Sequence, residues 1–451
     1  MDCRDCNVSQ GVEHRYDCVF GTILREIIIT TSSNKGFMRR IAPDSVMRNP
    51  DFRRFWFSSI LAHFGAQITL LALPICAVLM LHATPAQMGT LAAFESLPFL
   101  LFGLPSGVLL DRLRRLPIMM CSDAMVAIAL ATVPLAWWLG ILSIPWLYAV
   151  GFVIGTGYVV GGSAEQVFLT FLVGRGGLVD AQSKFAATES AARVLGPGMA
   201  GGLVQLLGAP IAILCNVAGF IVSLLNLRRI RAREPQPLPS NAHPLRDIQE
   251  GLAFVWRHPL LRTLAWVSAG WHLLFYGYTA LHVIFATRVL GMTAGTIGMA
   301  NMFGGLGILA ASMLVKPFSK RFGTGGGILI GLCVSALGFA LVPAIPATLF
   351  GSTGWTLAAY AMVVFWIDCG ATLFFVPYSA LRQRVTPDAL LGRMVATMRA
   401  LTVAAAPLGA LLAGALGEGF GVRAGLGCIA TGAVVLAVGT VVKSRLRHVK
   451  D

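Results

Sequence analysis

Six ionisable side chains stand inside long apolar stretches of the sequence, where they could exchange protons or form ion pairs. They are Glu95, Asp123, Glu165, Glu189, Arg193 and Asp368. Ionisable groups in apolar spans are costly, so they usually pair with one another or line a cavity. Glu189 and Arg193 are four residues apart, on one face of a helix, and can neutralise each other. Their spacing predicts a structural ion pair.

Two of the acids lack a basic residue on their own apolar stretch. Glu95 lies about two turns from one end of its stretch, and Asp368 lies near the middle of another. A buried carboxyl group without a partner can exchange a proton near neutral pH. We therefore expect Glu95 and Asp368 to be the first candidates for proton coupling, and Glu165 and Glu189 the next. The alternative is a protonated acid that is hydrogen-bonded to a neighbouring helix.

The composition indicates a protein that crosses a membrane many times. Of 451 residues, 56 % are hydrophobic and 12 % are charged, whereas soluble proteins have about 25 % charged residues. The net charge of +15 does not indicate nucleic-acid binding, because no basic face is interleaved with aromatic residues. Membrane lipid is the expected surrounding.

Enzymatic and metal-binding functions find no support in the motifs. No Walker loop and no pairing of a nucleophile with a base stands out, so no enzyme and no cofactor are predicted. Six of the nine cysteines lie inside apolar stretches, where they behave as small apolar residues. Cys3, Cys6, His14 and Cys18 do not have the spacing of a standard zinc site, so no metal is expected.

Apolar runs long enough to span a bilayer, about 20 residues each, predict an all-α membrane protein with twelve transmembrane helices. The runs are 55–80, 87–110, 117–141, 145–172, 185–207, 210–227, 260–287, 293–315, 325–345, 353–378, 391–416 and 422–442. Lys and Arg concentrate before the first span, in every second loop and in the tail, whereas the opposite loops hold only Arg288 and Arg423. Because cytoplasmic loops are the positive ones, we expect both termini in the cytoplasm of a bacterial cell, with the spans in its inner membrane.

The spans divide into two six-helix bundles. Residues 47–229 form the first bundle, 230–258 a cytoplasmic linker with an amphipathic helix, 259–443 the second bundle and 444–451 a tail. Residues 1–46 are interpreted as a disordered extension, or as upstream of a start at Met38 or Met47. The halves repeat at an offset near 209, which aligns Asn49-Pro50 with His258-Pro259.

Three motifs give the sequence a resemblance to the major facilitator superfamily. They are GVLLDRLRR at 107–115, RVLGPGMAGG at 193–202 and VPYSALRQRVTPDALLGRM at 376–394. The region from about 48 to 443 resembles in particular the bacterial exporters that include the enterobactin exporter and macrolide efflux proteins. The resemblance implies two pseudo-symmetric bundles that work by alternating access.

The resemblance also implies a gate at the 2–3 loop. In that family the acid of the loop caps a helix across the two halves, and its arginines pair with nearby acids when the cytoplasmic side closes. The gate residues are then Gly107, Asp111, Arg112, Arg115, Asp123, Lys320 and Arg321. The alternative is that the arginines only determine topology.

The fifth span carries a cluster of small residues. Gly196, Pro197, Gly198, Gly201 and Gly202 remove side chains over two turns after Arg193, so another helix can approach closely. We expect that helix to be the eighth span, with its own glycines at 304–307. A seal against ions and plain packing are both open as the role of the contact.

The remaining polar residues of spans 1, 7 and 10 suggest the wall of a substrate cavity. The candidates are His63, Gln67, His272 and Tyr276, with the aromatic Phe374. Such a wall favours a large, partly apolar solute over a sugar. The sequence thus predicts a monomeric, proton-driven exporter of a drug, macrolide or siderophore. An importer of the same fold, for a siderophore or a peptide, and a sensor or assembly partner that transports nothing are the alternatives.

The topology can be tested with reporter fusions. Fusions at Pro235 and Asp451 should report the cytoplasm, and a fusion at Thr84 should report the periplasm, because positive loops stay inside. A C-terminal fusion that reports the periplasm would contradict the count of twelve spans.

Overall fold

The computed structural model describes residues 45–443, except 233, 235–243 and 388–389, together with Leu446. In this part of the chain the secondary structure is helical, and the only β-type pairing is an isolated bridge between Leu349 and Ser352. Cys3, Cys6, His14 and Cys18, at which no metal is expected, lie outside the described residues, as does most of the predicted extension.

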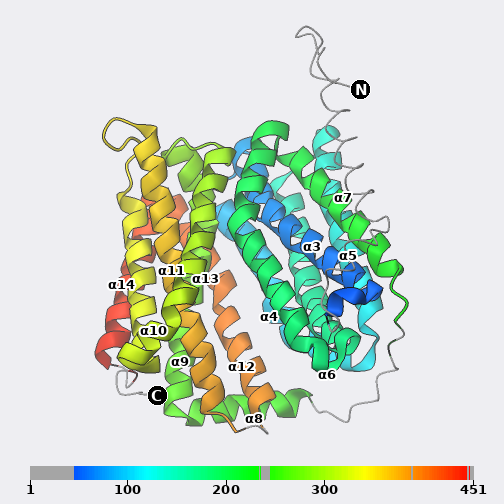
Figure 1. The fold of residues 1–451 in the computed structure, drawn as a ribbon. Helices are drawn as coiled ribbons and strands as arrows, with labels where there is room; N and C mark the ends of the chain where they lie inside the picture. Colours follow the sequence, from blue (N-terminus) through cyan, green and yellow to red (C-terminus); the bar gives the residue numbers. More distant parts are fainter. Residues whose placement is uncertain (1–44, 233, 235–243, 388–389, 444–445, 447–451) are drawn as a thin grey trace.

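From Ser45 to Arg228, the described part of the first half contains five long helices (Figure 1). After the short 3₁₀ helix η1 (Val46–Arg48) come α3 (Pro50–Ile75) with its π-helical end η2 (Cys76–Met80), α4 (Pro85–Arg112), α5 (Arg115–Trp138), α6 (Ile144–Leu207) and α7 (Ala209–Arg228). Helix α6 has 64 residues and holds the predicted spans 4 and 5. The two spans meet at Gly174, whose φ of 64° and ψ of 176° interrupt the helical path and suit only glycine.

The second half repeats this plan after the linker. It consists of α8 (Pro244–Arg257), α9 (Pro259–Ile284) with η3 (Phe285–Val289), α10 (Ala294–Leu341) with η4 (Val342–Ala344), α11 (Thr353–Arg384), α12 (Leu391–Val403), α13 (Ala405–Phe420) and α14 (Val422–Lys443). Spans 8 and 9 are joined within α10 at Gly323, with φ 75° and ψ 164°. Helices α12 and α13 together make span 11.

The described helices accommodate the twelve predicted spans. Eight stretches are long and apolar enough to cross a membrane, and two of these, 64 and 51 residues long, each have the length of two spans. Helices α4 and α9, with 28 and 26 residues, supply the other two.

The internal repeat extends to local backbone structure. Asn49 caps α3 by accepting hydrogen bonds from the amides of Asp51 and Phe52, and His258 caps α9 at the amide of Leu261. In both cases proline follows the cap, where its fixed φ suits the first helical position. The π-helical ends Cys76–Met80 and Phe285–Val289 are also 209 residues apart. Spans 1 and 7 are therefore equivalent elements of the two halves.

The halves touch closely at one end of the molecule, here called the Thr84 end, which carries the start of α4 and the end of α13. A Cβ added to Gly89 or Gly414 would lie 2.8 Å from the Cα of the other. The Glu418 carboxylate accepts a hydrogen bond of 3.2 Å from the amide of Ala86. The two backbones therefore meet without side chains between them.

A second glycine contact joins α6 to α10 at the same end. A Cβ on Gly201 would lie 2.8 Å from the Cα of Gly298, and the amide of Gly295 donates to the Gln205 side chain at 3.3 Å. Gly202, which was expected to share in this packing, would meet nothing within 4 Å and does not contribute to it.

Toward the opposite end, here called the Arg112 end, the halves separate. Gly103 lies four turns after Gly89 on nearly the same face of α4, and a Cβ there would meet nothing within 4 Å. Hydrogen bonds between described residues of the two halves, including one from Arg288 to the Val78 carbonyl, lie at the Thr84 end. The molecule is thus closed at the Thr84 end.

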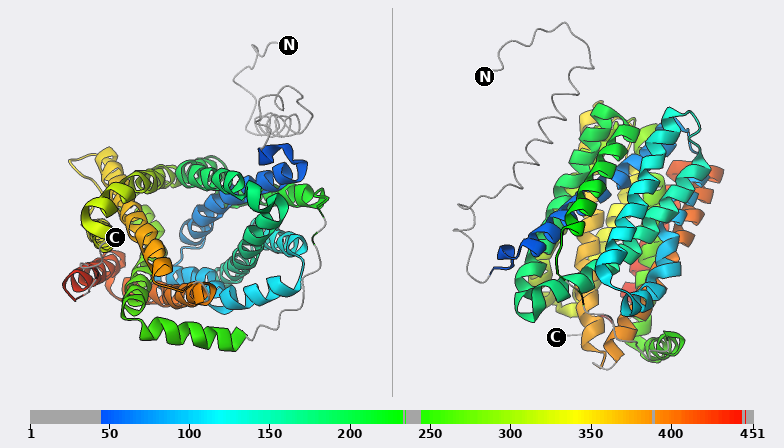
Figure 2. Two further views of the ribbon diagram at one scale, coloured as in Figure 1. Left: turned by 60° about the horizontal axis from the view of Figure 1, so that its bottom comes forward. Right: turned by 90° about the vertical axis from the view of Figure 1, so that its right-hand side faces the viewer.

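The ends of the linker are fixed to different halves. The Asp51 carboxylate accepts hydrogen bonds from the amides of Arg231 and Ala232, and Glu234 accepts one from the amide of Leu116. The amphipathic helix α8 lies across the Arg112 end of the bundle (Figures 1 and 2), and its Glu250 pairs with Arg393 of α12. The first residues of the predicted linker therefore belong with the first half.

The glycine contact predicts a difference between two adjacent substitutions. Gly201→Leu should lower the melting temperature of the purified protein, because the added side chain meets the backbone of α10 and overpacking costs about 1–3 kcal/mol. Gly202→Leu is the matched control and should melt like the wild type, because its side chain enters open space. Equal melting temperatures for the two variants would contradict the contact.

Candidate functional site

A cavity of about 290 Å³ lies between the two halves and is walled by both of them. Helices α3, α4 and α6 contribute from the first half, and α9, α10 and α11 from the second. Its polar side chains are those of Gln67, Glu95, Arg193, Tyr276, Tyr278, Thr279, His282, Asn301 and Asp368. The other residues that line it have apolar side chains or none. The two acids predicted as proton-coupling candidates therefore face the same space from opposite halves.

Glu95 is held at the wall of this central cavity by two glycines of α6. A Cβ on Gly151 would lie 3.0 Å from the Glu95 Cγ, and one on Gly155 would lie 2.3 Å from the Glu95 carbonyl oxygen. Since a side chain at either position would push α4 away, the glycines allow α6 to pack directly against the acid. The local sequence GFVIGTG thus positions Glu95.

Asp368 faces the same cavity from the second half. It lies on α11 over Gly304 of α10, where a Cβ would come within 2.1 Å of its Oδ2. Gly305, the next residue, packs against the backbone of Arg193 and Val194. The glycines predicted at the contact between spans 5 and 8 therefore also bring α10 close to Asp368 and Arg193.

The predicted ion pair between Glu189 and Arg193 is present. The Arg193 Nε and Nη2 atoms donate to Glu189 Oε1 at 3.1 and 3.0 Å. Both side chains are about half exposed, so the pair adds little to stability. It holds the Arg193 guanidinium, paired with Glu189, at the wall of the cavity.

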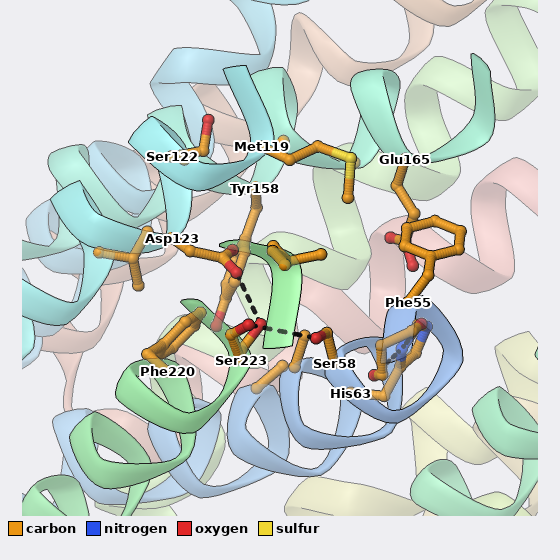
Figure 3. Close-up of a pocket in the computed structure, with 18 residues that line it drawn as sticks. Phe55, Ser58, His63, Met119, Ser122, Asp123, Tyr158, Glu165, Phe220 and Ser223 are labelled. Carbon is orange, nitrogen blue, oxygen red and sulfur yellow. Dashed lines mark hydrogen bonds between the residues drawn. The ribbon is translucent and has the colours of Figure 1, made fainter. Parts of the chain in front are cut away.

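A second pocket, of about 200 Å³, lies inside the first half between α3, α5, α6 and α7 (Figure 3). Asp123 lies on one side of it and Glu165 and His63 on the other. The Asp123 Oδ2 accepts a hydrogen bond of 2.8 Å from Ser223 Oγ. Asp123 was expected to pair with the arginines of the 2–3 loop. In the described part of the chain its partner is instead Ser223, because α5 turns this side chain into the bundle.

The expected substrate-contact residues divide into three groups. Gln67 and Tyr276 line the central cavity, whereas His63 lines the pocket of the first half. His272 packs edge-on against Phe375 and bonds to the Ser268 carbonyl, and Phe374 is fully buried and stacked on Tyr378. His272 and Phe374 thus belong to the packing of the second half, because α9 and α11 turn these faces toward each other.

The cluster of small residues at 196–202 of α6 reaches the central cavity. A Cβ on Gly196 would meet the Gln67 side chain at 2.4 Å, and one on Gly198 would meet the Met302 sulfur at 2.2 Å. Pro197 lines the cavity itself, and its carbonyl oxygen faces Gly298. These residues bring α6 close to α3 and to α10 at once.

The gate residues are not joined across the halves in this state. Arg112, Lys320 and Arg321 are exposed, and they form no ion pair with a described residue. The surroundings of Gly107 and the side chain of Asp111 are outside the described part of the structure. The Glu234 carboxylate, from the linker, accepts a hydrogen bond from the amide of Leu116 and so caps the start of α5. No pattern in the sequence indicates this role.

Three polar residues at these sites were missed in the sequence. Asn301 and His282 line the central cavity, and Tyr158 lines the pocket of the first half. Each is a polar side chain within an apolar span, which is the signal that could have identified it.

Comparison with known proteins agrees with this architecture. The sequence is 30 % identical over 410 residues to the multidrug efflux pump Tap of Mycolicibacterium fortuitum, covering 87 % of this chain and 95 % of that protein. It is 24 % identical over 372 residues to the enterobactin exporter EntS of Citrobacter koseri, covering 82 % and 86 %.

Solved structures share the fold at low sequence identity. The nucleoside transporter NupG superposes with a TM-score of 0.72 at 12 % identity, over 87 % of this chain and 98 % of that one. A bacterial homologue of the iron transporter ferroportin, in its inward-facing state, gives a TM-score of 0.68 at 16 % identity, over 88 % and 98 %.

The sequence profile of the Major Facilitator Superfamily matches residues 55–399. Two helical halves with an internal repeat wall the central cavity, and the match covers more than half of the residues. This multi-pass membrane protein therefore belongs to the Major Facilitator Superfamily.

Proposed function

We propose that this protein is a proton-driven exporter of a partly apolar small molecule, working by alternating access in the bacterial inner membrane. The observation that carries the proposal is the central cavity, in which Glu95 of one half and Asp368 of the other face the same space. A carboxyl group on each half can hold a proton while the cavity opens first to one side and then to the other.

The lining of the cavity supports a partly apolar substrate. Phe275, Tyr276 and Tyr278 contribute aromatic surface, and leucine, isoleucine and proline side chains contribute much of the rest. Ligand sites of this type use a mainly apolar wall with a few polar groups for orientation. The two relatives named as an efflux pump and an exporter support the outward direction.

The charge distribution supports an assignment of the two ends. The Arg112 end carries the positive loops, which stay in the cytoplasm, so the Thr84 end faces the periplasm. The structure, closed at the Thr84 end, then represents the inward-facing state. In the outward-facing state we expect Asp111 and the arginines of the 2–3 loop to close the cytoplasmic side. Both termini lie in the cytoplasm on this proposal, and the monomer is the functional unit.

In this proposal, substrate export is coupled to proton movement because the proton and the substrate compete for the same carboxylates. An ionised carboxylate in an apolar cavity is costly, so either a proton or a polar group of the substrate must compensate it. In the outward-facing state a proton from the periplasm binds, and in the inward-facing state it leaves to the cytoplasm. Proton entry then drives substrate export.

Glu95→Gln tests the first coupling candidate. This variant should lose uphill export but retain exchange of substrate down its gradient, because the amide keeps the shape of the side chain without carrying a proton. The measurement is transport of a fluorescent, partly apolar dye such as ethidium in proteoliposomes, with and without a pH gradient. Asp180→Asn, which removes the charge of a half-buried acid of α6 that lines neither pocket, is the control and should pump like the wild type.

Asp368→Asn tests the second candidate in the same assay. Its export should become insensitive to the pH gradient, because Asp368 is the only acid that lines the described cavity from the second half. If both neutral variants pump against a gradient with unchanged pH dependence, neither residue carries the proton. Glu165 and Glu189 are then the next residues to test.

A further inference from the structure

The corner between α8 and α9 leaves two tryptophan side chains partly uncovered. Trp256 of α8 is 51 % exposed and Trp266 of α9 is 64 % exposed. Their rings meet at an interplanar angle of 62°, with centroids 6.2 Å apart. Helix α8 lies along the outer edge of the bundle at the Arg112 end (Figure 2). The pair therefore forms an exposed aromatic surface at this corner.

Contacts with the second half fix how α8 is rotated. Val255 is fully buried, and a Cβ on Gly251 would lie 2.3 Å from the Thr397 hydroxyl oxygen and 2.9 Å from the Arg393 carbonyl oxygen, both on α12. Gly251 and Val255 are four residues apart and so lie on one face of the helix. Because that face is packed, the rotation of α8 is fixed and Trp256 stays on its uncovered side.

Two exposed arginines flank the tryptophans. Arg257 is the last residue of α8 and Arg262 lies in the first turn of α9. Their guanidinium groups form no hydrogen bond or ion pair with a described residue. The second bundle has three acids in its sequence, Asp368, Asp388 and Glu418. Asp368 lines the cavity, Glu418 lies at the Thr84 end, and Asp388 is outside the described residues. No described acid of the second bundle is therefore placed to neutralise the two arginines.

The order of these groups along the chain matches the order of layers at a membrane surface. Both arginines lie within four residues of His258, where α9 begins. Trp266 lies seven residues after Pro259, which is about 10 Å farther along the helix axis. Arginine binds phosphate through parallel hydrogen bonds, and tryptophan is enriched at the headgroup level of membranes. The corner therefore offers positive charge at the height of the phosphates and an aromatic surface just below them.

We propose that this corner binds the headgroup of an anionic phospholipid of the inner leaflet. Arg257 and Arg262 bind its phosphate, and Trp256 and Trp266 pack against the glycerol backbone and the first carbons of its acyl chains. The inference rests on the proposed function for the orientation of the molecule, which places the Arg112 end in the cytoplasm. Anionic lipids attract basic segments next to the membrane on that side. A free phosphate ion would satisfy the arginines but leave the tryptophans uncovered, so the occupant is a lipid.

A lipid at this corner connects the membrane to the end of the protein that is open. Helix α8 is paired with α12 through Glu250 and Arg393, and it continues into α9 after His258. The two halves separate at this same end. The bound lipid therefore anchors the cytoplasmic ends of α8, α9 and α12 together in the inner leaflet as the halves move.

The test is native mass spectrometry of the purified full-length chain in neutral detergent, with added phosphatidylglycerol or phosphatidylcholine. The wild type should bind its first phosphatidylglycerol at least about tenfold more tightly than phosphatidylcholine, because each arginine near the lipid charge favours binding. The double variant Arg257→Gln/Arg262→Gln should lose this preference. Arg228→Gln/Arg231→Gln, the same loss of charge at exposed arginines of the first half, is the control and should keep it. Trp266→Leu should weaken the binding of phosphatidylglycerol several-fold.

The outcomes separate this inference from the proposed function. A wild type without the preference, or a preference that survives in Arg257→Gln/Arg262→Gln, would overturn the lipid site. An equal loss in both double variants would show that only the overall charge counts and would overturn it too. Displacement of the lipid by an excess of inorganic phosphate, or unchanged binding in Trp266→Leu, would contradict a lipid as the occupant. Because the readout is binding alone, none of these results bears on whether the protein exports a substrate against a proton.

Discussion

An ionisable side chain inside an apolar span must have a partner or a cavity, because an isolated charge there is too costly. This constraint accounts for where the chain places its acids. Glu189 has Arg193, Asp123 has Ser223, and Glu95 and Asp368 have the cavity between the halves. The placements of Glu95 and Asp368 depend on glycines that let another helix come close, Gly155 for Glu95 and Gly304 for Asp368. The small residues thus determine how closely the helices pack around these two acids.

The same small residues determine which end of the molecule is closed. At Gly89 and Gly201 the halves meet backbone to backbone, whereas Gly103 farther along α4 meets nothing. Without a hydrophobic driving force between helices in lipid, close packing and a few hydrogen bonds decide the contact. Such a contact is weak enough to open, and alternating access requires that the two ends close in turn.

The spans could be predicted from the sequence because apolar runs end at recognisable turn residues, such as Thr84-Pro85 and His258-Pro259. The nearly continuous helical path through Gly174 and Gly323 could not, because the charged residues beside these glycines indicate only a loop between two spans. The pair of Glu189 with Arg193 follows from spacing on one helix. The position of Asp123 does not, because its neighbours come from α3 and α7 and depend on how the helices are rotated. For the same reason His272 and Phe374 were expected in the cavity but pack inside the second half.

The central claim is that inward proton movement drives export through the cavity that holds Glu95 and Asp368. It is tested most directly by reconstituting the wild-type protein in proteoliposomes that contain a pH-sensitive dye and imposing a gradient of partly apolar fluorescent compounds such as ethidium. The account predicts proton flux that requires the compound and runs opposite to it. Movement of the compound without protons, or of both in the same direction, would contradict the account.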